Sequence, residues 1–266
     1  MLLRAAWRLA GAALHALHGA LICAVVFPFL DDAGRARRIR GWSVRMLDRL
    51  GVRLHVAGGV HPGPVLLCAN HVSWLDILVI DAIRPARFVA KADLRHWPLL
   101  GFMIAAAGTL FIERERKRDA LRVVHHIAEA FRAGATVAVF PEGTTGEGRG
   151  LLPLHGNLLQ AAIATETALQ PVAIRYGDGG SPFSPAAAYV GATTLAQSAW
   201  RVACAEGLEA HVSLLPPLPT AATARRTLAA AAGARIQAAL DLAANGASAI
   251  GAEATSGASE STDSLK

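Results

Sequence analysis

A histidine and an aspartate five residues apart, His71 and Asp76, are the side chains whose types and spacing best suit chemistry. A neutral imidazole has a pKa of about 6.5 and can act as a general base near neutral pH. A carboxylate that accepts one ring N–H fixes the tautomer and leaves the other nitrogen to take a proton. Ser73 lies between the two as an alternative nucleophile, although the chain has no Gly-x-Ser-x-Gly elbow. The spacing alone also fits a surface histidine near a surface aspartate.

A second polar segment, at 140–144, follows about one βαβ unit later and contains Glu142, Gly143 and Thr144. The glutamate can bind hydroxyl groups or orient a site. Glycine permits close approach of the backbone, and its N–H or that of Thr144 can donate to a developing oxyanion. The alternative is a Pro-Glu-Gly turn that only closes a strand.

Each polar segment follows a short apolar run that is typical of a buried strand. Strands are predicted at 52–56, 64–68, 86–90, 109–112, 136–140, 171–174, 188–190 and 211–215. Helices are predicted at 75–83, 94–107 with an interruption at Pro98, 119–132, 156–168 and 221–244. This alternation predicts an α/β fold, a single domain with a mostly parallel or mixed central sheet flanked by helices.

Polar residues that follow predicted strands are expected to share one edge of this sheet. Five of them each come just after a strand: His71, Lys91, Arg114, Glu142 and Arg175. The carboxyl ends of parallel strands meet at the same edge, where α/β proteins place their binding sites. The sequence therefore predicts one site built from these side chains.

Composition narrows the possible partners. Hydrophobic residues make up 53% of the 266 residues, and the mean hydropathy is +0.37, which favours contact with lipid over a large buried core. A net charge of +6 suits an anionic membrane, a phosphorylated substrate or nucleic acid. No nucleic-acid motif supports the last, so no such partner is predicted. Three scattered cysteines indicate reduced thiols, and no cluster has zinc-ligand spacing, so no metal is predicted.

An N-terminal segment without Asp, Glu, Lys or Arg runs from residue 9 to residue 30, long enough to cross a bilayer. Arginines follow it at Arg35, Arg37, Arg38, Arg40, Arg45, Arg49 and Arg53. By the positive-inside tendency, the large C-terminal part is expected in the cytoplasm. We predict a membrane-associating helical segment at 1–40, spanning or re-entrant. A buried N-terminal helix is the alternative.

Four blocks in this order resemble the motifs of the glycerolipid acyltransferase family, whose first block is His-x4-Asp. The blocks are 70–76 (NHVSWLD), 108–114 (GTLFIER), 140–145 (FPEGTT) and 170–174 (QPVAI). The resemblance covers about residues 50 to 215, and ordered blocks are far more specific than one motif. Three residues differ from those that the family often has: Thr145, His155 and Gln170.

The resemblance implies transfer of an acyl chain from acyl-CoA or acyl carrier protein to the sn-2 hydroxyl of lysophosphatidate, without a cofactor. It implies that His71 is the general base and that Asp76 orients it. The acceptor phosphate needs fixed positive charge, which Arg114 and Lys91 can supply, although Arg114 also fits a solvated charged turn. The block with Glu142, Gly143 and Thr144 is implied to bind the acceptor.

Three alternatives remain open from the sequence. The acceptor can be another lyso-lipid, such as lyso-ornithine lipid. A hydrolase would use Ser73 or a bound water, and a lipid-binding protein would have no turnover. We expect an acyltransferase domain at 41–245, a disordered tail at 246–266, and a location on the cytoplasmic face of the bacterial inner membrane, where the surface is anionic.

Overall fold

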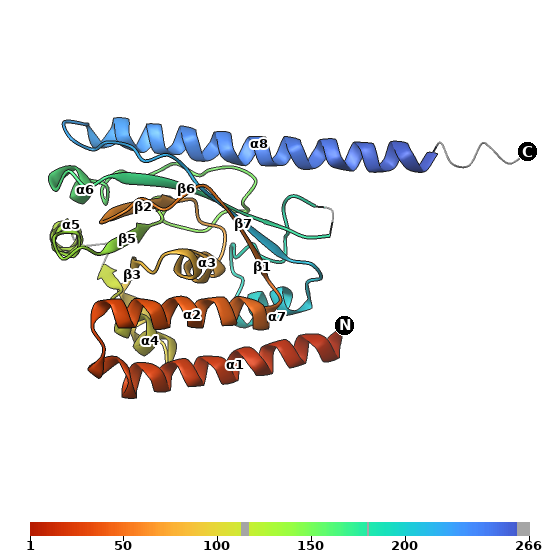
Figure 1. The fold of residues 1–266 in the computed structure, drawn as a ribbon, viewed down its shortest axis with the longest axis horizontal. Helices are drawn as coiled ribbons and strands as arrows, with labels where there is room; N and C mark the ends of the chain where they lie inside the picture. The colour runs from red at the N-terminus through yellow and green to blue at the C-terminus, as the bar shows by residue number, and fades with distance from the viewer. Residues whose placement is uncertain (113–116, 180, 260–266) are drawn as a thin grey trace, which may run out of the picture.

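A seven-stranded mixed sheet forms the centre of the protein, with strand order β1-β7-β6-β2-β5-β3-β4 (Figure 1). The computed structural model describes residues 1–112, 117–179 and 181–259, with side chains at all of these except 117–121, 243 and 245–259. The strands are β1 (Arg53–Ala57), β2 (Val65–Ala69), β3 (Arg87–Lys91), β4 (Leu110–Ile112), β5 (Thr136–Val139), β6 (Leu169–Gly177) and β7 (Glu209–Leu214). Strands β2 to β6 are parallel, whereas β7 is antiparallel to β6 and parallel to β1. The predicted α/β class with a mixed sheet is confirmed.

Helices cover both faces of this sheet (Figure 1). They are α1 (Leu2–Val25), α2 (Asp32–Leu50), α3 (Leu75–Ile83), α4 (Leu100–Ala106), α5 (Lys117–Arg132), α6 (Gln160–Ala164), α7 (Leu195–Cys204) and α8 (Arg225–Ser259), with short 3-10 helices at Phe27–Phe29 and Ala92–His96. One apolar core lies between the sheet and α2, α3 and α7, and another between the sheet and α5, α6 and α8.

Strand β2 shows how the sequence dictates these two cores. All five of its residues are buried. Successive side chains of a strand point to opposite faces, and accordingly Leu67 packs in the core with α3 while Leu66 and Cys68 pack in the core with α5. Burial on both faces is typical of a parallel strand and explains the continuous apolar run. The segment that follows β2 therefore leaves the sheet at a rigid, central position.

The N-terminal helices α1 and α2 form an antiparallel hairpin against the domain (Figure 1). His15 and Trp42 join them: the Trp42 indole N–H donates to the His15 carbonyl (3.0 Å), and the His15 Nε2 lies 3.0 Å from the Trp42 carbonyl. A side chain at Gly19 would lie 2.4 Å from the Trp42 ring, so the close packing requires glycine. Among the described residues, α1 is the one helix long and apolar enough to cross a membrane.

The interruption expected at Pro98 in the helix at 94–107 is confirmed: a 3-10 helix precedes this residue and α4 follows it, because proline removes a backbone donor. Other elements differ from the sequence expectation. The helix expected from residue 156 begins only at Gln160. Residues 188–190 form no strand. The helix α8 continues to Ser259, past the expected start of the disordered tail at 246, in a segment rich in helix-favouring alanine.

Strand β6 is longer than expected, with a consequence for the site. It continues through Gly177 because β7 pairs with it as far as Gly177 and Glu209. Arg175 therefore lies inside the strand instead of after its end, so the expectation that it joins the edge of the sheet is wrong.

A buried carboxyl in α3 makes stability depend on pH. Burial raises the pKa of Asp81 from 3.8 to about 8, although the Ala86 N–H, which donates to it at 3.0 Å, acts in the opposite direction. Between these pH values the folded chain holds a proton that the unfolded chain has lost, so the free energy of unfolding falls as pH rises through this window. An asparagine carries no such proton and keeps an oxygen for Ala86. We expect Asp81→Asn to raise the melting temperature more at pH 8 than at pH 5; an equal effect at both values would contradict this explanation.

Candidate active site

His71 and Asp76 come together at the carboxyl end of β2. The Asn70 amide first fixes the chain, because its Nδ2 donates to the Ile174 carbonyl (2.8 Å) and its Oδ1 accepts from the Ile174 N–H (2.7 Å). The helix α3 begins at Leu75, which places Asp76 in its first turn. As a result His71 Nδ1 and Asp76 Oδ2 lie 2.7 Å apart. The sequence prediction that these two residues pair is confirmed in its geometry.

The Asp76 carboxylate is fully buried and accepts from three further donors. Its Oδ2 accepts from the N–H groups of Val72 (2.7 Å) and Ser73 (3.0 Å), and its Oδ1 accepts from the Tyr176 hydroxyl (2.7 Å). Burial raises the pKa of Tyr176 well above its usual value and Asp76 raises it further, so the phenol stays a donor. Because the carboxylate only accepts, Nδ1 of His71 carries the proton and Nε2 keeps a lone pair.

The His71 ring is supported on one face and partly open to solvent. Its side chain is 20% exposed. It stacks on the Phe140 ring at a centroid distance of 4.0 Å and an interplanar angle of 13°. The Gly146 N–H donates to the His71 carbonyl (2.8 Å), which ties the backbone to the loop after β5. An imidazole fixed in this way can take a proton from a substrate hydroxyl.

Glu142 is buried and orients the chain beside His71. Its Oε1 accepts from the His71 N–H (2.6 Å), and its Oε2 accepts from the Leu152 N–H (2.9 Å). Burial raises the pKa of Glu142, while these two backbone hydrogen bonds oppose the rise. Both oxygens already hold a protein donor, so the carboxylate links the two loops that border the histidine.

Gly143 and Thr144 form the turn after Glu142. Gly143 has a φ of +74°, a left-handed conformation that glycine adopts without strain. Its N–H donates to the Phe140 carbonyl (3.1 Å) and closes the turn, so it does not serve as the expected oxyanion donor. Thr144, an exposed residue, carries the other N–H expected to make that contact.

Comparisons with known proteins agree with this geometry. A family model described as Acyltransferase matches residues 52–175, which include both polar segments. A lyso-ornithine lipid O-acyltransferase of Pseudomonas aeruginosa is 37% identical over 195 residues, which cover 73% of this chain and 75% of that protein. The chain belongs to the lysophospholipid acyltransferase family.

Two further relatives of the acyltransferase are informative. A 1-acyl-sn-glycerol-3-phosphate acyltransferase of Neisseria meningitidis is 40% identical over 157 residues, covering 58% of this chain and 60% of that protein. The crystal structure of the LPA acyltransferase PlsC from Thermotoga maritima matches with a TM-score of 0.59 and 19% identity, covering 88% of this chain and 96% of that one. At this identity the structural likeness shows the fold.

The basic residues of the acyltransferase predicted to join the site have different positions. Lys91 is exposed at the carboxyl end of β3, the same edge of the sheet that His71 follows. Arg114 lies outside the described residues. Arg175 is placed within β6, and its Nη1 donates to the Pro182 carbonyl (2.7 Å), so the structure does not bring it to the histidine.

Ser73 is poorly placed to act as a nucleophile in the acyltransferase. It is fully buried, and within the described part of the chain its hydroxyl has no hydrogen-bond partner. A serine nucleophile needs an adjacent base within hydrogen-bond reach. Its backbone N–H serves the site instead, by donating to Asp76.

Tyr176 is the site residue that sequence reasoning missed. Its hydroxyl donates to Asp76, although the two residues are 100 positions apart in the sequence, a separation that no local motif covers. The segment at 188–190, expected as a strand, also borders the site: the Tyr189 N–H donates to the Val72 carbonyl (3.0 Å), and the Thr145 hydroxyl donates to the Tyr189 carbonyl.

Removing the Tyr176 hydroxyl tests its supporting role in the acyltransferase. We expect Tyr176→Phe to lower the free energy of unfolding by about 1.5–3 kcal/mol, because a hydrogen bond to a charged group is lost. Turnover should fall less than about tenfold, since the hydroxyl does not contact the imidazole. Urea unfolding and initial rates measure the two effects. A turnover loss as large as that of a His71 variant would mean that Tyr176 acts on substrate.

Proposed function

We propose that the protein transfers a fatty acyl chain from acyl-CoA or acyl carrier protein to the sn-2 hydroxyl of lysophosphatidate, which yields phosphatidate. The observation that carries the proposal is the His71–Asp76 pair, with its tautomer fixed by a buried carboxylate. The similarity to the Neisseria meningitidis enzyme supports this acceptor.

The reaction proceeds by direct attack in a ternary complex. The acceptor hydroxyl oxygen forms a bond to the thioester carbonyl carbon as its proton passes to Nε2 of His71. The buried Asp76 carboxylate, 2.7 Å from Nδ1, stabilises the imidazolium. The C–S bond then breaks, and the imidazolium returns the proton to the departing thiolate. The substrate hydroxyl is the nucleophile, so the protein needs none of its own.

Binding of the acceptor phosphate needs fixed positive charge. We propose that Lys91, at the same edge of the sheet as His71, and Arg114, as the bidentate partner, provide it. We propose that the turn formed by Gly143 and Thr144 also binds the acceptor, because the preceding residue, Glu142, accepts a hydrogen bond from the His71 N–H. No cofactor takes part in this scheme.

A second acceptor, lyso-ornithine lipid, is favoured by one specific observation. The Pseudomonas aeruginosa relative that covers 73% of this chain bears that activity in its name. The same base and the same proton transfer serve either hydroxyl, so the two functions differ in the binding of the acceptor. Removal of Arg114 distinguishes the two functions, because it should lower activity most with an acceptor that carries a phosphate.

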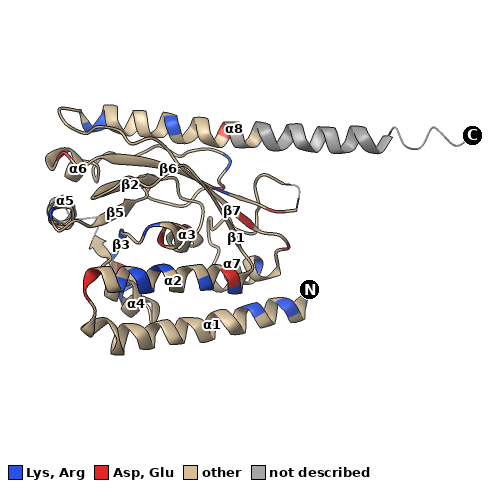
Figure 2. Ribbon diagram, in the orientation of Figure 1, with Lys and Arg blue, Asp and Glu red and all other residues tan. Residues whose placement is uncertain are grey.

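The helical hairpin is proposed to hold the acyltransferase on the cytoplasmic face of the inner membrane. The outward face of α1 exposes large apolar side chains: Leu3, Trp7, Leu14, Leu17 and Leu21. Figure 2 shows basic residues along α2, whereas α1 carries them only near its N-terminus. The apolar side chains of α1 would contact the lipid, and the arginines of α2 would bind anionic head groups. Each arginine near the surface contributes about 1 kcal/mol to this binding.

The test uses detergent-solubilised protein, wild type, His71→Ala and Arg114→Ala. Each receives labelled acyl-CoA or acyl carrier protein with lysophosphatidate, with lyso-ornithine lipid, or without acceptor, and the lipid products are resolved. Phosphatidate from the wild type only in the presence of acceptor supports the proposal. Preferential product from lyso-ornithine lipid supports the second acceptor. Free fatty acid without acceptor indicates a hydrolase and contradicts both.

A further inference from the structure

Two histidines and a glutamate on the edge strand β1 and its neighbour β7 form a cluster that acyl transfer does not use. In the parallel pairing of β1 and β7, His55 lies opposite His211, and Arg53 lies opposite Glu209. Residues two apart on a strand share a face of the sheet, so Glu209 and both imidazoles project from the same side. The two rings stack with centroids 4.8 Å apart and an interplanar angle of 14°.

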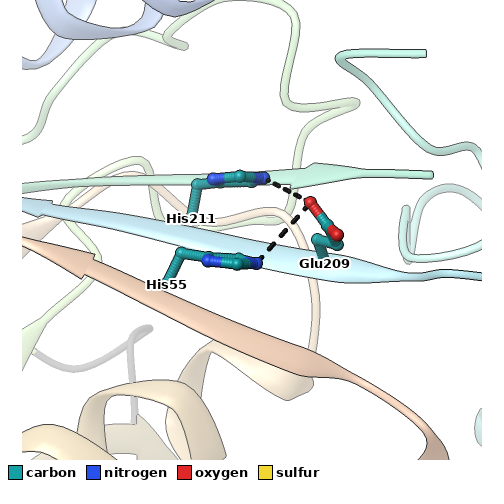
Figure 3. A group of neighbouring side chains, drawn as sticks. All are labelled: His55, Glu209 and His211. Carbon is teal, nitrogen blue, oxygen red and sulfur yellow. Dashed lines mark ion pairs between the residues drawn. The ribbon is translucent and has the colours of Figure 1, made fainter. Parts of the chain in front are cut away.

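The Nε2 atoms of both imidazoles lie near the same carboxylate oxygen of Glu209. The Nε2 atom of His211 lies 3.2 Å from Glu209 Oε2, and that of His55 lies 3.6 Å from it (Figure 3). Ligand atoms bound tetrahedrally at 2.0–2.1 Å from an ion are separated by about 3.3–3.4 Å. The three ligand atoms all lie within 4.8 Å of one another, so a small rotation of the rings suffices to surround an ion.

The other oxygen of the carboxylate is already held. Glu209 Oε1 accepts from Arg53 Nη2 (2.6 Å) and Nε (3.1 Å). The Oε2 atom of Glu209 therefore points toward the histidines. Arg53 orients this carboxylate in the way that residues around a metal site orient the ligands of the metal. His55 is about half exposed, so solvent can supply a further ligand. The nearby Arg175 directs its Nη1 to the Pro182 carbonyl.

We propose that His55, Glu209 and His211 bind a divalent transition-metal ion of the zinc class, with one coordination position open to water. Two imidazoles and one carboxylate suit zinc, nickel or copper better than magnesium or calcium, which prefer oxygen ligands. The ion ties the edge strand β1, and with it α2, to the rest of the sheet.

This site is separate from the acyl-transfer machinery. His211 pairs with Arg175, whereas the next residue of β6, Tyr176, points to the opposite face of the sheet and reaches Asp76. Acyl transfer through His71 therefore does not need the ion, and the inference stands whichever acceptor the protein uses.

The test measures metal binding by the full-length protein without a polyhistidine tag, after treatment with a chelator. We expect calorimetry to show one equivalent of Zn²⁺ per chain, and Co²⁺ to give the intense visible absorption of a tetrahedral site. His55→Ala should weaken Zn²⁺ binding at least about tenfold. The matched control is His125→Ala, which removes an exposed histidine that also pairs with a glutamate, Glu129, at 3.1 Å.

Thermal melting gives a second readout that does not depend on activity. Zn²⁺ should raise the melting temperature of the wild type and of His125→Ala but leave the melting temperature of His55→Ala unchanged. Mg²⁺ should not raise the melting temperature of any of the three proteins. Without metal, His55→Ala should have the same melting temperature as the wild type, which would show that the variant folds. Absence of Zn²⁺ binding by the wild type, or binding by His55→Ala equal to the wild type, would overturn the proposal.

Discussion

Replacing His71 by alanine should lower kcat for acyl transfer by about 10²–10⁴-fold, the usual contribution of a general base. The ring packs on Phe140 and is partly exposed, so its loss should leave the rest of the fold in place. The backbone N–H that binds Glu142 remains available to any residue at position 71.

Initial rates at saturating donor and acceptor measure this effect, and circular dichroism with thermal melting confirms folding. His125→Ala, which changes a histidine on α5, is the matched control and should keep wild-type rates. A folded His71→Ala protein that retains more than about one tenth of the turnover would reject His71 as the base.

Replacing Asp76 by asparagine should lower kcat by about 10²–10³-fold, through the loss of charge. The N–H groups of Val72 and Ser73 both donate to Oδ2, so the amide oxygen has to take that place and still accepts from His71. The tautomer is therefore kept, and the amide NH₂ faces the Tyr176 hydroxyl, which can turn to accept. What disappears is the negative charge that stabilises the imidazolium.

The comparison with Tyr176→Phe isolates that charge. Both variants disturb one hydrogen bond to position 76, but only Asp76→Asn removes the carboxylate. Single-turnover rates for the two folded variants should therefore differ at least about tenfold. Equal rates would show that the orientation of the histidine, and not the charge beside it, controls turnover.

Much of the site was predictable because it is local. His71 lies in the loop after β2 and Asp76 in the first turn of α3, and the apolar run of β2 marks where that loop begins. The same reasoning placed Glu142 after β5. Only the bond to the His71 backbone showed that this carboxylate orients the loop.

The contributions that escaped prediction come from pairings across long stretches of chain. Tyr176 reaches Asp76 only because β6 lies beside β2, and the length of β6 depends on antiparallel pairing with β7. His55 and His211 likewise lie side by side through strand register, which sequence spacing cannot reveal, and the metal site proposed there depends on that register. Sequence periodicity identifies a strand but does not reveal its neighbours.

The position of the hairpin against α7 constrains the order of events during synthesis. Arg8 in α1 donates to the carbonyls of Ala203 and Ala205, and β1 pairs with β7. The helix α1 and the strand β1 can therefore make these contacts only after α7 and β7 have been synthesised. Until then, the apolar face of α1 lacks its protein partner and needs a bilayer or a chaperone to cover it. The contacts that dock α1 on α7 and β1 on β7 therefore form late, after synthesis of the segment whose Tyr176 hydroxyl completes the hydrogen bonds of Asp76.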